Sequence, residues 1–212
     1  MDTLYYYPGA CSLSVHAVLE ESGHAYQAKK IDIHGGDNET AEYLAINPRG
    51  LVPVLATGDG LLTEAPAILL HLAEAHPEAG LVPPAGSVAR TRCYEWLFLG
   101  ATYPHPAFSH LMRPERFAAD AAASDAVRER GREHFWQALQ HLDGRLAGRA
   151  FALGDAYSIC DPYLMIFYLW GRFVGLPVGD LAAYSRLVGR VVERPAVKRA
   201  IADEQLPVSL AA

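Results

Sequence analysis

The sequence predicts an α+β N-terminal domain followed by an all-α C-terminal domain. Short strand and helix patterns alternate up to about residue 76, and no convincing strand pattern follows. Prolines and glycines gather at residues 77–87, where we expect a linker between domains 1–76 and 88–212. With 212 residues, 51% of them apolar, the chain is long enough for two domains with a sizeable core.

The first domain is predicted from apolar periodicity and from the residues that interrupt it. Gly23 stops the first helix, Pro48 ends the second, and the Gly58-Asp59-Gly60 turn closes a hairpin. The order strand-helix-strand-helix-strand-strand-helix is thioredoxin-like. The expected elements are strand 2–7, helix 14–22, strand 26–33, helix 40–46, strands 54–57 and 61–63, and helix 66–75.

The second domain is predicted from helical patterns alone. Ser87 can cap a helix, which Pro104 must kink or end because proline lacks a backbone donor. Residues 124–146 repeat apolar positions mostly on one helical face. Ser158-Ile159-Cys160-Asp161 is a variant capping box, and residues 163–173 behind it are apolar nearly all round. We expect that segment to be the central buried helix.

Charge and hydropathy exclude several classes of function. The net charge of −6 provides no electrostatic footprint for nucleic acid or for an anionic membrane surface. No apolar run approaches the roughly 18 residues that a membrane span needs, and Met1-Asp2-Thr3-Leu4 leads into a strand pattern without a signal peptide. We therefore expect a cytoplasmic protein.

Cysteine and histidine spacing argues against a disulfide framework and against a metal site. The three cysteines, Cys11, Cys93 and Cys160, are odd in number, far apart, and form no Cys-x-x-Cys pair. Cys93 and Cys160 fall in helical patterns, so we expect them in the core. The nine histidines include no pair at the i,i+4 spacing and no His-Glu-x-x-His motif. No metal is expected.

Two nearby segments predict a site for a small peptide-like ligand. The peptide bond between Val52 and Pro53 can be cis, which would aim the Val52 backbone groups away from their own sheet. Pro66 suits the first helical position, so we expect Ala65 to be the N-cap, with free N–H groups that favour a carboxylate. Glu64 beside them can hold an ammonium group. Glutathione carries a peptide, a carboxylate and an amino group.

Together with Tyr5-Tyr6-Tyr7-Pro8-Gly9-Ala10-Cys11-Ser12-Leu13-Ser14, these segments resemble the glutathione transferases, most closely the bacterial beta class. The resemblance implies the glutathione transferase fold and glutathione as co-substrate. It also implies a detoxification enzyme that conjugates the glutathione thiolate to a small electrophile. Family members are homodimers, so the resemblance implies a dimer seam formed by helices 66–75 and 88–99.

The resemblance and the local chemistry suggest catalytic residues. Cys11 matches the beta-class cysteine that faces the glutathione sulfur, and its place before a helix predicts a lowered thiol pKa. Tyr6 can donate a hydroxyl hydrogen bond to the thiolate, with strand packing as the alternative. His105 aligns with the family histidine that reaches the ligand from the helical domain, with a partly exposed histidine between two prolines as the alternative. Val52, Pro53, Glu64 and Ala65 complete the expected glutathione site.

Four departures from the family pattern keep other functions open. Leu51, Phe98 and Pro106 stand where the class has glutamine, asparagine and lysine, and Gly35-Gly36 replaces a loop lysine. One alternative is glutathione-dependent thiol-disulfide exchange through Cys11. Another is a non-catalytic binding or regulatory protein on the same scaffold. Apolar side chains can line a pocket for the electrophile, or they can be core: Leu13, Phe108, Leu111 and Met112.

Overall fold

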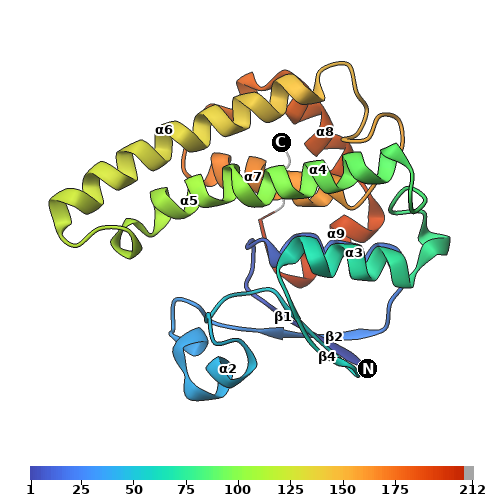
Figure 1. Ribbon diagram of the computed structural model, residues 1–212, viewed down its shortest axis with the longest axis horizontal. Coiled ribbons are helices and arrows are strands. Elements are labelled where there is room, and N and C mark those ends of the chain that lie inside the picture. The colour runs from blue at the N-terminus through green and yellow to red at the C-terminus, as the bar shows by residue number, and fades with distance from the viewer. Residues whose placement is uncertain (208–212) are drawn as a thin grey trace.

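The computed structural model describes residues 1–207 and has a thioredoxin-like domain followed by a helical domain (Figure 1). The predicted order of the first seven elements is confirmed. The elements are β1 (Asp2–Tyr6), α1 (Ser12–Ser22), β2 (Tyr26–Lys30), α2 (Ala41–Ile46), β3 (Val54–Thr57), β4 (Gly60–Thr63) and α3 (Ala65–Ala75).

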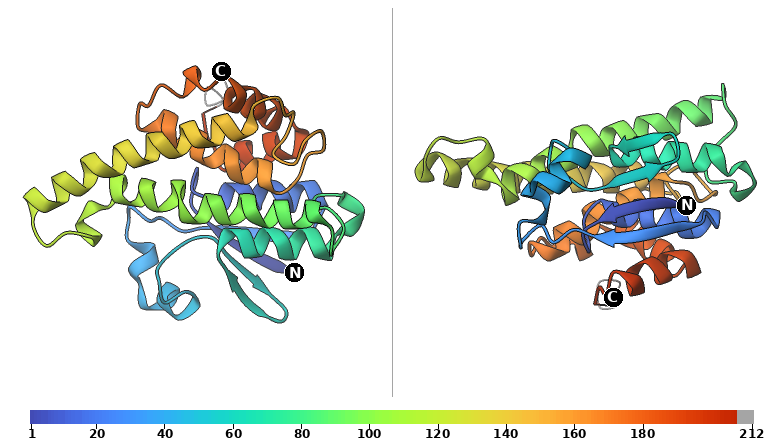
Figure 2. Two further views of the ribbon diagram at one scale, coloured as in Figure 1. Left: turned by 45° about the horizontal axis from the view of Figure 1, so that its top comes forward. Right: turned by 90° about the horizontal axis from the view of Figure 1, so that it is seen from below.

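The four strands form one mixed sheet in the order β2-β1-β3-β4. β1 pairs in parallel with β2 and antiparallel with β3, and β4 returns antiparallel to β3. α1 and α3 lie between the sheet and the helical domain, whereas α2 lies on the other side of the sheet (Figures 1 and 2). A small core of Ile31, Tyr43 and Val54 fills the space beneath α2.

Side-chain alternation along β1 sends neighbouring tyrosines to opposite faces of the sheet. Tyr5 packs edge-on against Tyr43 of α2, with ring centroids 6.0 Å apart. Tyr6 faces the opposite side and lies 5.6 Å from the ring of His16 in α1. The first domain therefore directs one tyrosine of the strand toward α2 and the next toward α1.

The helical domain begins where Ser87 caps α4, its Oγ accepting the Arg90 N–H at 3.1 Å. The prolines end α4 as expected, since it stops at Thr102 and Pro104 opens the next helix. Two helices near the C-terminus were not predicted, although both carry apolar faces. The helices are α4 (Val88–Thr102), α5 (Pro104–Met112), α6 (Ala121–Leu146), α7 (Cys160–Phe173), α8 (Ala182–Val192) and α9 (Pro195–Asp203).

α7 is the buried central helix that the capping motif predicts. Asp161 accepts the Ser158 N–H at 2.7 Å, and the Ser158 hydroxyl accepts the Cys160 N–H at 3.3 Å. The Ser158 carbonyl accepts from the Asp161 N–H at 3.1 Å. Pro162, whose missing N–H would otherwise serve that carbonyl, therefore leaves no acceptor unpaired.

The two domains share one continuous core, in which α1 packs against α3, α7 and α9. Cys93 of α4 and Cys160 of α7 are fully buried there, as expected, with their sulfurs 3.4 Å apart. Within residues 1–207, no helix combines the length and the apolar character needed to cross a membrane.

Candidate functional site

Cys11 is the N-cap residue of α1, at the end of the loop that follows β1. Its Sγ lies 3.6 Å from the Val52 carbonyl oxygen, which accepts the S–H. Burial raises the pKa of the Cys11 thiol to about 12. The N–H groups of Cys11 and Ser12 favour the thiolate, but their effect is smaller than that of burial. The expected lowered pKa is therefore wrong, because the loss of hydration outweighs the helix N-terminus.

The peptide bond between Val52 and Pro53 is cis, as predicted. Hydrogen bonds hold the preceding residue, since the Leu51 carbonyl accepts from the Tyr43 hydroxyl at 2.8 Å and from Asn47 Nδ2 at 2.7 Å. Within residues 1–207, no group accepts a hydrogen bond from the Val52 N–H. That donor remains open to a ligand, next to the Cys11 sulfur.

Glu64 is the N-cap residue of α3. Ala65, expected as the N-cap, is instead the first helical residue, because the Glu64 carbonyl already accepts the Ala67 and Ile68 N–H groups. Glu64 has a φ of 66°, a conformation that non-glycine residues seldom adopt and that recurs at ligand clamps. Its carboxylate pairs with Arg49, a partner that the sequence analysis missed.

His105 lies in the first turn of α5, against two aromatic rings of α7. Its ring centroid is 5.1 Å from that of Trp170 and 6.1 Å from that of Phe167. Burial lowers the pKa of His105, and the charge of Glu64 opposes this effect in part. Glu64 also acts on the pKa of Cys11. The charge of Glu64 thus acts on both the Cys11 thiol and the His105 ring. Cys11 in turn contacts Val52.

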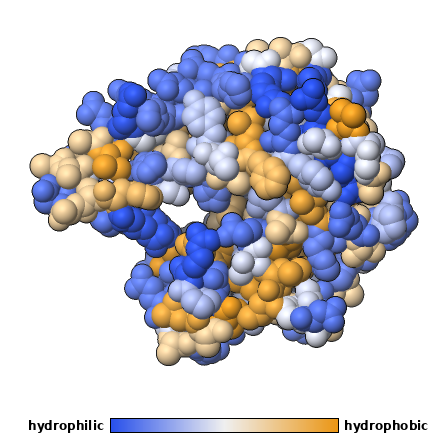
Figure 3. Space-filling model, viewed as in Figure 1, coloured by the Kyte–Doolittle hydropathy of each residue, from blue (hydrophilic) through white to orange (hydrophobic). Residues whose placement is uncertain are grey.

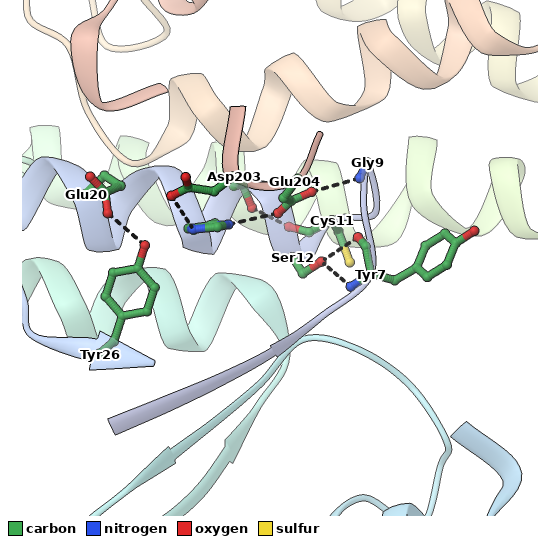
Figure 4. Close-up of polar contacts among 10 residues, drawn as sticks. Tyr7, Gly9, Cys11, Ser12, Glu20, Tyr26, Asp203 and Glu204 are labelled. Atoms are coloured by element: carbon green, nitrogen blue, oxygen red, sulfur yellow. Dashed lines mark hydrogen bonds and ion pairs between the residues drawn. The ribbon is translucent and has the colours of Figure 1, made fainter. Parts of the chain in front are cut away.

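Tyr6 lies near the carboxylates at the C-terminal end of α9. Its pKa is raised by burial first and then by the charges of Glu204 and Asp203. Both carboxylates belong to the C-terminal end of α9, where His16 of α1 contacts them. Figure 4 shows Asp203 and Glu204 beside α1, with Glu204 reaching Gly9 in the β1–α1 loop. No hydrogen bond joins Tyr6 to Cys11 within the described residues, so a catalytic role for Tyr6 stays a prediction.

The helical domain holds the loop before Cys11 from two sides, which sequence reasoning missed. The Gly9 N–H donates to Glu204 Oε2 at 2.9 Å (Figure 4). The Gly9 carbonyl accepts from Trp170 Nε1 at 2.9 Å. The Glu204 side chain is fully buried and also contacts His16 Nδ1 at 3.1 Å. Burial raises the pKa of Glu204, and the His16 and Gly9 contacts oppose this.

Residues expected to line the electrophile pocket divide into two kinds. Leu13 and Leu111 are core, and Phe108 stacks on Trp170 at 4.3 Å. Met112 is exposed. Within the described part of the chain, no group of three or more His, Cys, Asp or Glu side chains is placed to hold a metal.

Comparisons with known proteins agree with this geometry. Residues 2–74 match the family model "Glutathione S-transferase, N-terminal domain". Glutathione S-transferase GstA of Escherichia coli O157:H7 is 34% identical over 205 residues, covering 96% of this chain and 98% of the relative.

Two solved structures are similar along their whole length. A glutathione transferase homologue from Sulfitobacter, with bound glutathione, has a TM-score of 0.91 at 28% identity, covering 98% of this chain and 99% of that one. A bacterial beta class glutathione S-transferase from Sphingomonas chungbukensis has a TM-score of 0.86 at 32% identity, covering 97% and 100%.

Proposed function

The chain belongs to the glutathione S-transferase family, and from this premise we propose that it conjugates the glutathione thiolate to small electrophiles. One observation carries the proposal. The Cys11 sulfur lies at the N-terminus of α1, beside a Val52 backbone whose N–H is open to a peptide. The similar Sulfitobacter homologue has bound glutathione, which supports the same ligand here.

The proposed reaction is attack by the glutathione sulfur. The thiolate forms a carbon–sulfur bond with the electrophile, and a leaving group departs with the electron pair of the bond that breaks. Val52 pairs with the peptide backbone of glutathione next to Pro53, and Glu64 with the Ala65 N–H holds the γ-glutamyl end. Because Glu64 already pairs with Arg49, the ammonium group of glutathione competes with that guanidinium.

Cys11 serves this reaction as a hydrogen-bond donor. A thiol whose pKa is about 12 stays protonated at neutral pH, so its S–H can turn from the Val52 carbonyl to the glutathione thiolate and donate to it. The same protonation disfavours attack by Cys11 on a disulfide, because the thiolate is the nucleophile in exchange. Burial of Cys11 therefore supports conjugation over thiol-disulfide exchange.

We propose that His105 is the residue of the helical domain that contacts glutathione. Its lowered pKa keeps the ring neutral near pH 7, where one nitrogen can donate a hydrogen bond to glutathione. We expect His105→Ala to weaken glutathione affinity or turnover modestly, by roughly the tenfold that one hydrogen bond contributes. Unchanged kinetics would remove His105 from the site.

Calorimetry and a conjugation assay test the proposal together. The wild-type chain should bind glutathione, and it should release chloride from 1-chloro-2,4-dinitrobenzene only when glutathione is present. Cys11→Ser keeps a donor at this position, so it should retain most of the conjugation rate. A wild-type chain that gives no heat with glutathione would overturn the proposal and favour the non-catalytic alternative.

A further inference from the structure

A cavity of about 300 Å³ lies between the loop after β2 and the C-terminal end of α5. Figure 3 shows the surface hollowed between the α5–α6 tip and the α2 side of the molecule. The cavity combines apolar side chains with charged ones. Its lining residues are Ile33, His34, Asn38, Glu39, Met112, Arg113, Glu115 and Arg116.

Arg113 is the partly buried cation of this cavity, and its guanidinium has no ion pair or hydrogen bond within the described residues. Three other arginines that are partly or fully buried have carboxylate partners: Arg90 contacts Glu74, Arg145 contacts Glu95, and Arg194 contacts Glu21. A partly buried guanidinium without such a partner is unusual, since burial of an unpaired charge is unfavourable.

The charges around Arg113 are of both signs, and none of them forms an ion pair with it in the described part of the chain. Burial lowers the pKa of Arg113, and the nearby charge of Arg116 acts in the same direction. Glu115 and Glu39 oppose this by less, and both are exposed. Neither carboxylate forms an ion pair with either arginine among residues 1–207. The cavity lining therefore contains two arginines that have no ion-pair partner within the described residues, together with two exposed carboxylates.

The cavity adjoins the proposed site through two elements. α5 carries His105 in its first turn, and Arg113 follows eight residues later, about 12 Å along the helix axis. On the other side, the ring of His34 contacts the ring of Tyr7 at 5.5 Å, and Tyr7 precedes Cys11 in the same loop. A substrate that extended from the Cys11 sulfur toward the C-terminal end of α5 would approach Arg113.

We propose that Arg113, with Arg116 beside it, binds a carboxylate of a bound substrate and makes the chain select for carboxylate-bearing molecules. A guanidinium matches a carboxylate in a two-point hydrogen bond. Ile33 and Met112 provide apolar contact for the attached carbon skeleton. The carboxylate can belong to the electrophile or to the glycine end of glutathione. This inference rests on the proposed conjugation function.

Two matched electrophiles distinguish these sources. 4-Chloro-3,5-dinitrobenzoate carries a carboxylate, and 4-chloro-3,5-dinitrobenzamide is neutral and otherwise similar in size. In each reaction the glutathione thiolate forms the carbon–sulfur bond, and chloride leaves with the electron pair of the broken carbon–chlorine bond. If the electrophile supplies the carboxylate, Arg113→Gln should lower kcat/KM about tenfold for the benzoate and less than about twofold for the benzamide.

If glutathione supplies the carboxylate, Arg113→Gln should instead raise the KM for glutathione by the same factor with both electrophiles. Unchanged selectivity and unchanged KM for glutathione would overturn the proposal. Arg186→Gln is the matched control, because Arg186 is an exposed arginine of α8 outside the cavity. Thermal unfolding of both variants checks that they fold. Arg116→Gln provides a second, milder variant with an effect in the same direction.

A binding measurement separates failure of this inference from failure of the proposed function. If wild type conjugates neither electrophile, the function has failed, and calorimetry with unreactive 3,5-dinitrobenzoate tests the anion site alone. Weaker binding by Arg113→Gln than by wild type and Arg186→Gln would support the site. Equal binding by all three chains, or no binding by wild type, would overturn it.

Discussion

The sulfur of Cys11 is subject to two opposing effects on its protonation. The N-terminus of α1 favours the thiolate, and the removal of water around the sulfur favours the neutral thiol. Burial dominates and raises the pKa to about 12. The folded state holds this proton more tightly than the unfolded chain does. The resulting contribution of Cys11 to the free energy of unfolding is therefore complete below about pH 8.5, and it is lost as the pH rises toward 12.

We predict that Cys11 resists alkylation in the folded protein. At pH 7.5 iodoacetamide should modify it on the order of a hundredfold more slowly than free glutathione, since only the thiolate reacts. The rate should rise with pH until the fold opens. Peptide mapping by mass spectrometry measures the modification, and the chain unfolded in guanidinium should label at Cys11, Cys93 and Cys160. Labelling of folded Cys11 at the rate of a free thiol would contradict this prediction.

The residues of the site differ in how far the sequence determines them. Local sequence patterns predict the sites at Val52-Pro53 and Glu64, because a proline and a helix start impose their geometry on adjacent residues. The residues around Cys11 in the sequence do not predict its protonation state. It depends on burial by elements distant in the sequence, which the loop sequence does not encode.

At the scale of elements, the N-terminus of α7 is fixed by a capping motif that can be read from the sequence. The Asp161 carboxylate is fully buried and accepts hydrogen bonds from the Ser158 N–H and from the Ala152 N–H, each at 2.7 Å. It therefore joins the helix start to the loop before it. The capping pattern predicts the first contact, whereas the bond to Ala152 needs the folded loop.

We predict that Asp161→Ala destabilises the protein by about 2–4 kcal/mol, because it removes a helix cap and leaves two buried N–H groups unpaired. Urea unfolding followed by circular dichroism measures the change. Asp155→Ala is the control, since Asp155 is exposed in the same loop and should change stability by less than about 0.5 kcal/mol. Equal stabilities of the two variants would refute a structural role for the cap.

At the scale of the whole molecule, α4 leaves large apolar side chains in solvent. Phe98 is 63% exposed and Val88 is 76% exposed, on the helix expected to form the dimer seam. Exposed apolar residues gathered on one surface are typical of protein interfaces. We therefore keep the homodimer as a prediction.

Light scattering tests the dimer. The wild-type chain should have twice the 23.1 kDa chain mass at micromolar concentration, and Phe98→Asp should shift it toward the monomer. Phe173→Asp is the matched control, because Phe173 is 71% exposed at the end of α7, outside the expected seam. A monomeric wild type would refute the prediction.

The sequence predicts the architecture up to α7 except for the separate helix α5, and it misses α8 and α9. Both have strongly amphipathic patterns, and Pro195 marks the start of α9, so the missed signals were present. The contact between Gly9 and Glu204, in contrast, could not be predicted from the sequence. The two residues are 195 positions apart, and no local pattern links a glycine turn to a distant carboxylate.

That contact has a consequence for how the protein is made. A ribosome synthesises the β1–α1 loop early, but the groups that hold Gly9 belong to α7 and to the end of α9. The loop that carries Cys11 therefore lacks its anchors during most of synthesis. A nascent chain that stalls before α9 would have every residue of the expected glutathione site and still lack the buried carboxylate that fixes the loop.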